Sequence, residues 1–252
     1  MKSILGFRLR KKKEEKAHCK EAAAALDSFI QNFYLGELLS EAEAKRNLEL
    51  GLVEILENER HTSNGLLLTS DGYFLTPKHC VDSGIKKMKI RLHDNSLYPM
   101  KKVCAWGKKY LDVALVKAGV PDECQPIRYK LYNTASLESE RAVILTRRYG
   151  KSIVKPTSLY KEATLAFNKL GRITTSLDNE VVSLKERLFL ENYTSCEGDS
   201  GGVVVSLDGR IMGIYTGALA GEKFKLDTGV KLIEALELVS VYCEHLKKKL
   251  AD

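Results

Sequence analysis

The segment from Cys196 to Gly202 reads Cys-Glu-Gly-Asp-Ser-Gly-Gly, so one serine lies among three glycines between two apolar segments. Glycine adopts the backbone conformations of tight turns, and such a turn can aim several backbone N–H groups at one point. N–H groups that converge in this way could stabilise an oxyanion by hydrogen bonds. The hydroxyl of Ser200 becomes a nucleophile only if a general base lies within hydrogen-bond reach and a third group orients that base.

Two upstream residues could fill these roles. His79 follows the β-like segment Tyr73–Thr76, and Asp112 precedes another, Val113–Val116. Taken alone, Asp112 could cap a strand and Ser200 could only form a turn. Because a lone histidine is usually structural, no role is assigned to the others, which are His18, His61, His93 and His245.

Three motifs in the order histidine, aspartate and serine resemble those of the trypsin-like (chymotrypsin-fold) serine proteases. They are His79-Cys80, Asp112-Val113-Ala114-Leu115 and Gly198-Asp199-Ser200-Gly201-Gly202. The 33-residue gap between the histidine and the aspartate, with the Ser70–Thr76 segment before it, is more similar to the bacterial HtrA-related branch. The resemblance covers the chain from about residue 50 onward.

This resemblance implies a serine endopeptidase that acts on a polypeptide substrate through an acyl-enzyme, without cofactor or metal. Ser200 would be the nucleophile, His79 the general base and then acid, and Asp112 the group that fixes the imidazole tautomer. The oxyanion hole would consist of the backbone N–H groups of Gly198 and Ser200. The alternative is a catalytically inactive, protease-like binding module that acts through its N-terminal arm, although no triad member is missing.

Activation in the digestive branch requires a new N-terminus that pairs with the aspartate before the serine. No Ile-Val-Gly-Gly-like site precedes His79. We therefore expect Asp199 to have another partner, and the enzyme to be competent as synthesised unless the arm controls it.

The implied primary specificity pocket is neutral. Its residues would be Thr194, Ser195, Thr216, Gly217 and Ala218. Thr194 stands where trypsin has the aspartate that binds Arg or Lys, so a buried cationic side chain would be unpaired. We expect cleavage after Val, Ala, Thr, Leu or Gln, unless Glu222 or Lys223 of the loop 220–225 lines the base.

Six cysteines occur, and two match framework cysteines of secreted relatives. Cys80 and Cys196 lack the partners that those relatives have, so we expect free thiols and a reducing, cytoplasmic location. Delivery outside the cell by a signal-independent route is the alternative. A disulfide between Cys104 and Cys124 remains open.

The net charge of +7 lies mostly in residues 1–20, which hold eight Lys or Arg and two Glu. A solvated tail is the simpler interpretation, and contact of this segment with an anionic surface or partner protein is the alternative. No nucleic-acid partner, transmembrane segment or secretory signal is predicted. A PDZ domain of about ninety residues is not expected after the closing helix.

The predicted fold is mostly β, with two six-stranded antiparallel β-barrels of the chymotrypsin type. Residues 1–47 form a basic, helical N-terminal arm, with one helix over 8–35 and a capping box at Ser40–Glu43 before a short second helix. Residues 48–252 form the protease domain, with barrels at about 48–120 and 138–226 and a C-terminal helix at about 228–250. The expected strands are Leu50–Leu56, Gly65–Leu68, Tyr73–Thr76, Met88–Leu92, Leu97–Ala105, Val113–Val116, Ala142–Thr146, Gly171–Ser176, Arg187–Leu190, Val203–Ser206 and Ile211–Tyr215.

Overall fold

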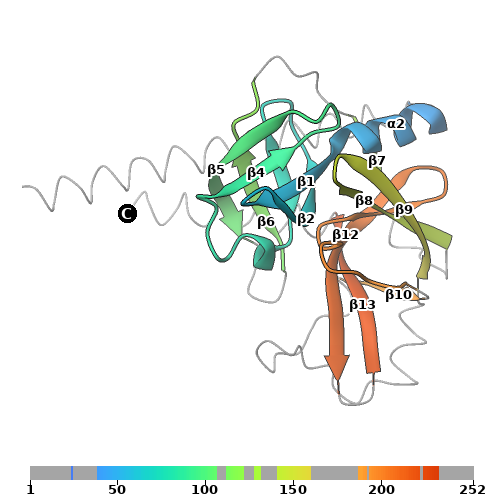
Figure 1. Cartoon of the computed structure of the whole chain (residues 1–252). Coiled ribbons are helices and arrows are strands. Elements are labelled where there is room, and N and C mark those ends of the chain that lie inside the picture. The colour runs from blue at the N-terminus through green and yellow to red at the C-terminus, as the bar shows by residue number, and fades with distance from the viewer. Residues whose placement is uncertain are drawn as a thin grey trace, which may run out of the picture.

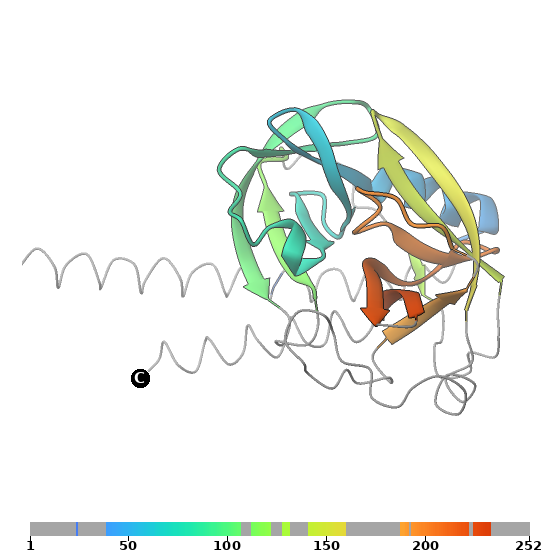
Figure 2. The ribbon, with the colours of Figure 1, turned by 60° about the horizontal axis from the view of Figure 1, so that its bottom comes forward.

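The computed structural model describes most of the expected β domain. The described residues are 24, 39–106, 112–121, 128–131, 141–159, 187–191, 193–221 and 224–232. Apart from residue 24, which is helical, the expected helix over 8–35 lies outside these residues, as do the strand Gly171–Ser176 and both Cys19 and Cys124. Figures 1 and 2 show two groups of strands side by side, the first in blue to green and the second in yellow to red.

The first group is a closed antiparallel barrel with the strand order β1-β2-β3-β6-β5-β4. Its interior holds a cluster of buried side chains, among them Val53, Ile55, Phe74, Ile90 and Val116. Each large aliphatic or aromatic side chain buried in this way contributes about 1.5–3 kcal/mol. The strands are β1 (Leu52–Glu57), β2 (Arg60–Leu67), β3 (Tyr73–Thr76), β4 (Met88–Arg91), β5 (Leu97–Trp106) and β6 (Ala114–Ala118).

The second group is a seven-stranded sheet with the order β11-β8-β9-β10-β13-β12-β7. Pairing between β11 and β12 closes six of these strands into a ring, and β7 joins β12 in parallel. The mostly β fold of the chymotrypsin type is thereby confirmed. The strands are β7 (Lys130–Leu131), β8 (Arg141–Arg148), β9 (Lys151–Leu159), β10 (Arg187–Glu191), β11 (Val203–Ser206), β12 (Arg210–Gly221) and β13 (Phe224–Lys231).

Two strands of the second barrel were not expected from the sequence. β9 contains Pro156 and alternates weakly, whereas β13 contains Asp227 and Gly229, which are depleted in strands. Backbone pairing with β8 and with β10 and β12 holds them in place. The expected closing helix at about 228 is therefore wrong at its start, because the strand β13 extends to Lys231.

The helix α2 (Glu41–Gly51) precedes the first barrel and carries the predicted capping box. The Ser40 side chain accepts from the Glu43 backbone N–H at 3.3 Å, and the Glu43 carboxylate accepts from the Ser40 N–H at 2.8 Å. The helix extends through Gly51 into the expected strand Leu50–Leu56. Gly51 is packed against Tyr129, where a Cβ would lie 1.6 Å from the phenol oxygen. No helix in the described residues is long and apolar enough to cross a membrane.

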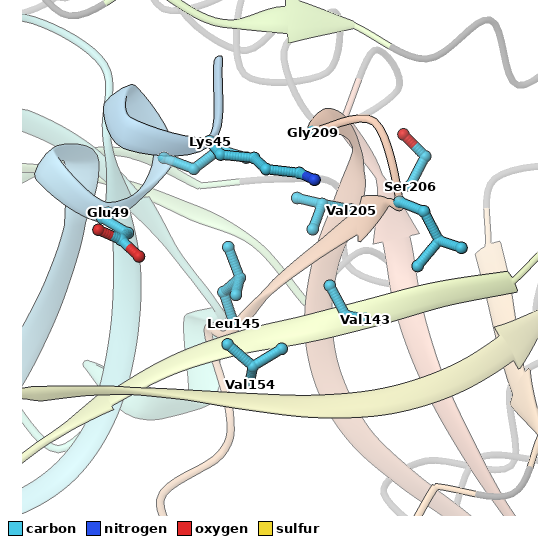
Figure 3. A pocket seen from close by; sticks show the side chains of 10 residues that line it. Lys45, Glu49, Val143, Leu145, Val154, Val205, Ser206 and Gly209 are labelled. Carbon is cyan, nitrogen blue, oxygen red and sulfur yellow. The ribbon is translucent and has the colours of Figure 1, made fainter. Parts of the chain in front are cut away.

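A pocket of about 230 Å³ lies between α2 and the second barrel. Figure 3 shows Lys45 and Glu49 of α2 on one side and aliphatic side chains of the strands on the other. Those aliphatic residues include Val143, Leu145, Val154 and Val205. None of the three candidate catalytic residues lines this pocket.

Candidate active site

His79 and Asp112 meet because the strands next to them are paired. β3 ends at Thr76 and β6 begins at Ala114, and these two residues are direct antiparallel partners. A short 3₁₀ helix, Lys78–Cys80, carries His79 away from β3. The Asp112 carboxylate accepts from the His79 backbone N–H at 2.9 Å and lies 2.5 Å from the ring Nδ1. These two contacts fix the orientation of the imidazole.

Ser200 lies in the turn between β10 and β11 and faces the same imidazole. Its Oγ is 3.3 Å from His79 Nε2. The Asn64 backbone N–H donates to the Ser200 carbonyl at 2.7 Å, which joins this turn of the second barrel to β2 of the first. The structure thus brings together the three residues that the sequence motifs predicted.

The surroundings of His79 favour its protonated form. The hydrogen bond to Asp112 and the nearby Cys80 thiol, whose Sγ is 3.4 Å from Nε2, raise the pKa of His79 to about 10 against the opposing effect of burial. The imidazole is therefore a stronger base than a free histidine.

The turn before Ser200 is held by its carbonyl groups. Gly198 has φ = +88°, and its carbonyl accepts from Asn64 Nδ2 at 2.8 Å and faces His61 Nε2 at 3.0 Å. The preceding carbonyl, that of Glu197, accepts from the Arg148 guanidinium. A Cβ on Gly198 would lie 2.4 Å from His61 Nε2, so both the backbone angle and the close contact require glycine here.

The same turn leaves two donors available. Within the described residues, neither the Gly198 N–H nor the Ser200 N–H has a hydrogen-bond acceptor. In a trans peptide the N–H points opposite to the carbonyl, so the Gly198 N–H points away from Arg148. Free, fixed N–H groups beside a nucleophile are what oxyanion stabilisation requires.

Asp199 has the alternative partner that the sequence led us to expect. Its carboxylate, only 3% exposed, accepts from Lys155 Nζ at 2.6 Å, from the Tyr193 hydroxyl at 2.8 Å and from the Cys196 backbone N–H at 2.7 Å. Lys155 lies on β9, a strand that the sequence did not predict. A cation from within the chain thus neutralises the buried aspartate.

The expected pocket residues lie on two segments of the second barrel. Thr216 is buried and donates to the Thr228 carbonyl at 3.2 Å, whereas Thr194 and Ala218 are exposed and Ser195 and Gly217 are half-buried. Glu222 and Lys223 lie outside the described residues.

Sequence reasoning missed the buried carboxylate of Asp227. Asp227 lies directly across from Ala218 in the β12–β13 pair and accepts from the Tyr215 hydroxyl at 2.6 Å.

Cys80 and Cys196 are free cysteines, as their missing partners led us to expect. In the described part of the chain, no group of three or more His, Cys, Asp or Glu side chains could hold a metal ion.

A sequence model of the family described as Trypsin matches residues 44–230. The chain belongs to the trypsin family. A similar protein among the trypsin-like proteases is a probable periplasmic serine protease do/HhoA-like from Haemophilus influenzae, 27% identical over 217 residues. The match covers 82% of this chain and 41% of that protein, so the chain spans less than half of its relative's length.

Solved trypsin-like proteases share the fold. The active form of the Rv3671c protease from M. tuberculosis has a TM-score of 0.58 at 17% identity, covering 79% of this chain and 83% of that one. An HtrA-type protease AlgW with decapeptide has a TM-score of 0.60 at 13% identity, covering 82% and 68%. These neighbours share the fold of the trypsin-family chain.

Proposed function

We propose that this trypsin-family chain is a serine endopeptidase whose nucleophile is Ser200. The observation that carries the proposal is the continuous contact from Asp112 through His79 to Ser200 Oγ, beside two backbone N–H groups that have no acceptor among the described residues. The inactive binding module is not favoured, because every group that the reaction needs is present and within reach.

In the proposed acylation step, His79 Nε2 takes the hydroxyl proton as Ser200 Oγ attacks the carbonyl carbon of the scissile peptide bond. The carbonyl oxygen becomes an oxyanion that accepts from the N–H groups of Gly198 and Ser200. When the C–N bond breaks, His79 gives its proton to the leaving amine. An ester between Ser200 and the acyl part of the substrate remains.

In the proposed deacylation step, a water molecule repeats the attack on this ester. His79 takes a proton from the water, and the second tetrahedral intermediate breaks to release a carboxylic acid while Ser200 regains its proton. Asp112 keeps its charge throughout and stabilises the imidazolium that forms in each half.

A burst experiment tests the two-step mechanism. With an activated ester substrate, acylation outruns deacylation, so the first turnover should release one equivalent of alcohol per active enzyme before the slower steady state. A linear release with no burst, at a rate equal to that of Ser200→Ala, would contradict the proposal.

We further propose that Lys155 makes the enzyme competent without a new N-terminus. Lys155→Met leaves the buried Asp199 carboxylate without its counter-charge, although the hydrogen bonds from Tyr193 and Cys196 remain; breaking a buried ion pair typically costs about 3–5 kcal/mol. We expect the turn to shift and kcat/KM to fall about 100-fold, as when an oxyanion donor is lost.

The matched variants make this test specific. Lys155→Arg keeps the cation and should retain most activity, and Lys151→Met, at an exposed lysine of the same strand, should have no effect. Activity of Lys155→Met within about threefold of wild type would contradict the role.

We also propose a neutral primary pocket, in which Thr194, Ser195 and Thr216 supply hydroxyl groups. The carboxylate of Asp227, across the β12–β13 pair from Ala218, already accepts from the Tyr215 hydroxyl. A peptide library should show cleavage after small or medium uncharged residues such as Val, Ala, Thr, Leu or Gln. One methylene is worth about 1–3 kcal/mol, so discrimination among them should be modest.

The same library can contradict the neutral pocket. A preference for Arg or Lys above about tenfold, which corresponds to 1.4 kcal/mol, would do so. Loss of that preference in Asp227→Asn would then assign the selectivity to Asp227.

A further inference from the structure

A β-bulge places two donors on the face of β2 that meets the second barrel. β1 and β2 pair in register from Leu52 to Ile55, where Ile55 is opposite Ser63, but the next residue, Leu56, is opposite His61. Thr62 is the extra residue. Side chains alternate along a strand, so without the bulge His61 and Asn64 would lie on opposite faces.

Because of the bulge, both side chains reach the Gly198 carbonyl. Asn64 Nδ2 donates to it at 2.8 Å, and His61 Nε2 lies 3.0 Å from it. The oxyanion turn of the second barrel is therefore held by β2 of the first barrel.

The second ring nitrogen of His61 faces a buried carboxylate, that of Glu54 on β1. The distance from His61 Nδ1 to Glu54 Oε1 is 3.1 Å. Glu54 is 0% exposed and also accepts from Arg91 NH1 at 2.9 Å. Burial alone would raise its pKa, but the hydrogen bonds from His61 and from two backbone N–H groups, with the charge of Arg91, lower the pKa of Glu54 to about 2. Glu54 is thus ionised at neutral pH.

Glu54 also holds the hairpin between β8 and β9. Its two oxygens accept from the backbone N–H groups of Tyr149 at 2.7 Å and Gly150 at 3.0 Å. Both turn residues have positive φ, +51° and +75°, as a two-residue type I′ turn requires. The residue just before this turn is Arg148, which donates to the Glu197 carbonyl.

Two successive carbonyls of the oxyanion turn therefore depend on one buried carboxylate. The Gly198 carbonyl is reached through His61, and the Glu197 carbonyl is reached through the hairpin that carries Arg148. The Glu197 carbonyl lies in the same planar peptide unit as the Gly198 N–H and sets its direction, whereas the Gly198 carbonyl lies in the next unit and holds the other side of Gly198.

We propose that Glu54 is a positioning residue for catalysis, which holds the oxyanion turn in its competent form through His61 and the β8–β9 hairpin. This inference rests on the proposed serine endopeptidase function. A misdirected N–H weakens the contact to the oxyanion, which exists only in the transition state and the tetrahedral intermediate. The loss should fall on kcat and leave KM nearly unchanged.

The test uses Glu54→Gln and His61→Phe, singly and together, on a peptide amide substrate. The rates are expressed per active site after titration with a fluorophosphonate, so unfolded protein does not count. We expect each single variant to lower kcat about 10-fold to 100-fold, a smaller loss than the removal of one oxyanion donor causes. KM should stay within about twofold of wild type.

The double variant separates positioning from general stability. If Glu54 acts largely through His61, the double variant should lie within about threefold of the lower single variant, because interacting sites are not additive. His61→Gln, which keeps a donor, should recover part of the rate lost in His61→Phe. Met100→Ala, in the first barrel's core and outside the site, should lower stability without changing kcat per active site.

Two outcomes would overturn the inference: a kcat per active site in Glu54→Gln within about threefold of wild type, or losses that multiply fully in the double variant. If Glu54→Gln does not fold, Glu54→Asp replaces it, because it keeps the charge and shortens the reach to His61. An inactive wild-type protein would instead refute the endopeptidase function and the inference with it.

Discussion

Ser200→Ala should reduce turnover of a peptide amide about a millionfold, and His79→Ala should cost nearly as much. Removing the nucleophile or its base from a triad abolishes the covalent route, and the residual rate reflects binding and the oxyanion donors alone. The two effects should not multiply in the double variant, because both residues serve one step. The measurement is kcat for the purified variants on one peptide substrate.

Ser83→Ala is the matched control for this prediction, since Ser83 is an exposed serine of the first barrel. It should keep full activity. A Ser200→Ala protein with more than about one per cent of the wild-type rate would be incompatible with a nucleophilic role, because loss of the nucleophile costs orders of magnitude more.

Asp112→Asn should lower kcat about 10⁴-fold at neutral pH while the fold persists. The amide replaces an acceptor next to His79 Nδ1 with a group that can donate, so the imidazole is no longer held in the tautomer that accepts the Ser200 proton. The charge that stabilises the imidazolium is lost as well. Asp208→Asn, at an exposed aspartate of the β11–β12 hairpin, is the matched control and should leave kcat unchanged.

The pH dependence of activity tests the contact between Asp112 and His79 independently. The general base must be neutral, so activity rises with pH as His79 loses its proton. Because Asp112 and then Cys80 raise the pKa of His79 to about 10, the acid limb of the wild-type profile should lie above the ordinary histidine value of 6.5. In Asp112→Asn this limb should move to lower pH; a limb that stayed in place would contradict the pairing.

The sequence predicted which three residues meet at the candidate site, because triad chemistry allows few residue types and the turn needs glycine. The capping box of α2 and most strands were also predictable, since their signals lie within a few residues of each other. The residues that hold the turn before Ser200 in place could not be predicted from the sequence. His61, Glu54 and Lys155 belong to no motif, because the contacts that they make join strands far apart in the chain.

Backbone irregularities explain why several other features of the fold could not be predicted from the sequence. The bulge at Thr62 reverses which face His61 occupies, and the plain alternation of the sequence gives no sign of it. β13 forms despite Asp227 and Gly229 because neighbouring strands pair with both of its edges. Sequence alternation likewise does not predict that Asp227 lies opposite Ala218, one of the expected pocket residues.

Labelling of the native protein with a fluorophosphonate, followed by peptide mapping, tests the central claim most directly. Phosphonylation requires a serine activated by its base and a free oxyanion site, so it reports the assembled geometry rather than the residues alone. We predict one equivalent of probe on Ser200, and none on Ser200→Ala or on the denatured protein. No labelling of folded wild type, or equal labelling after denaturation, would contradict the account.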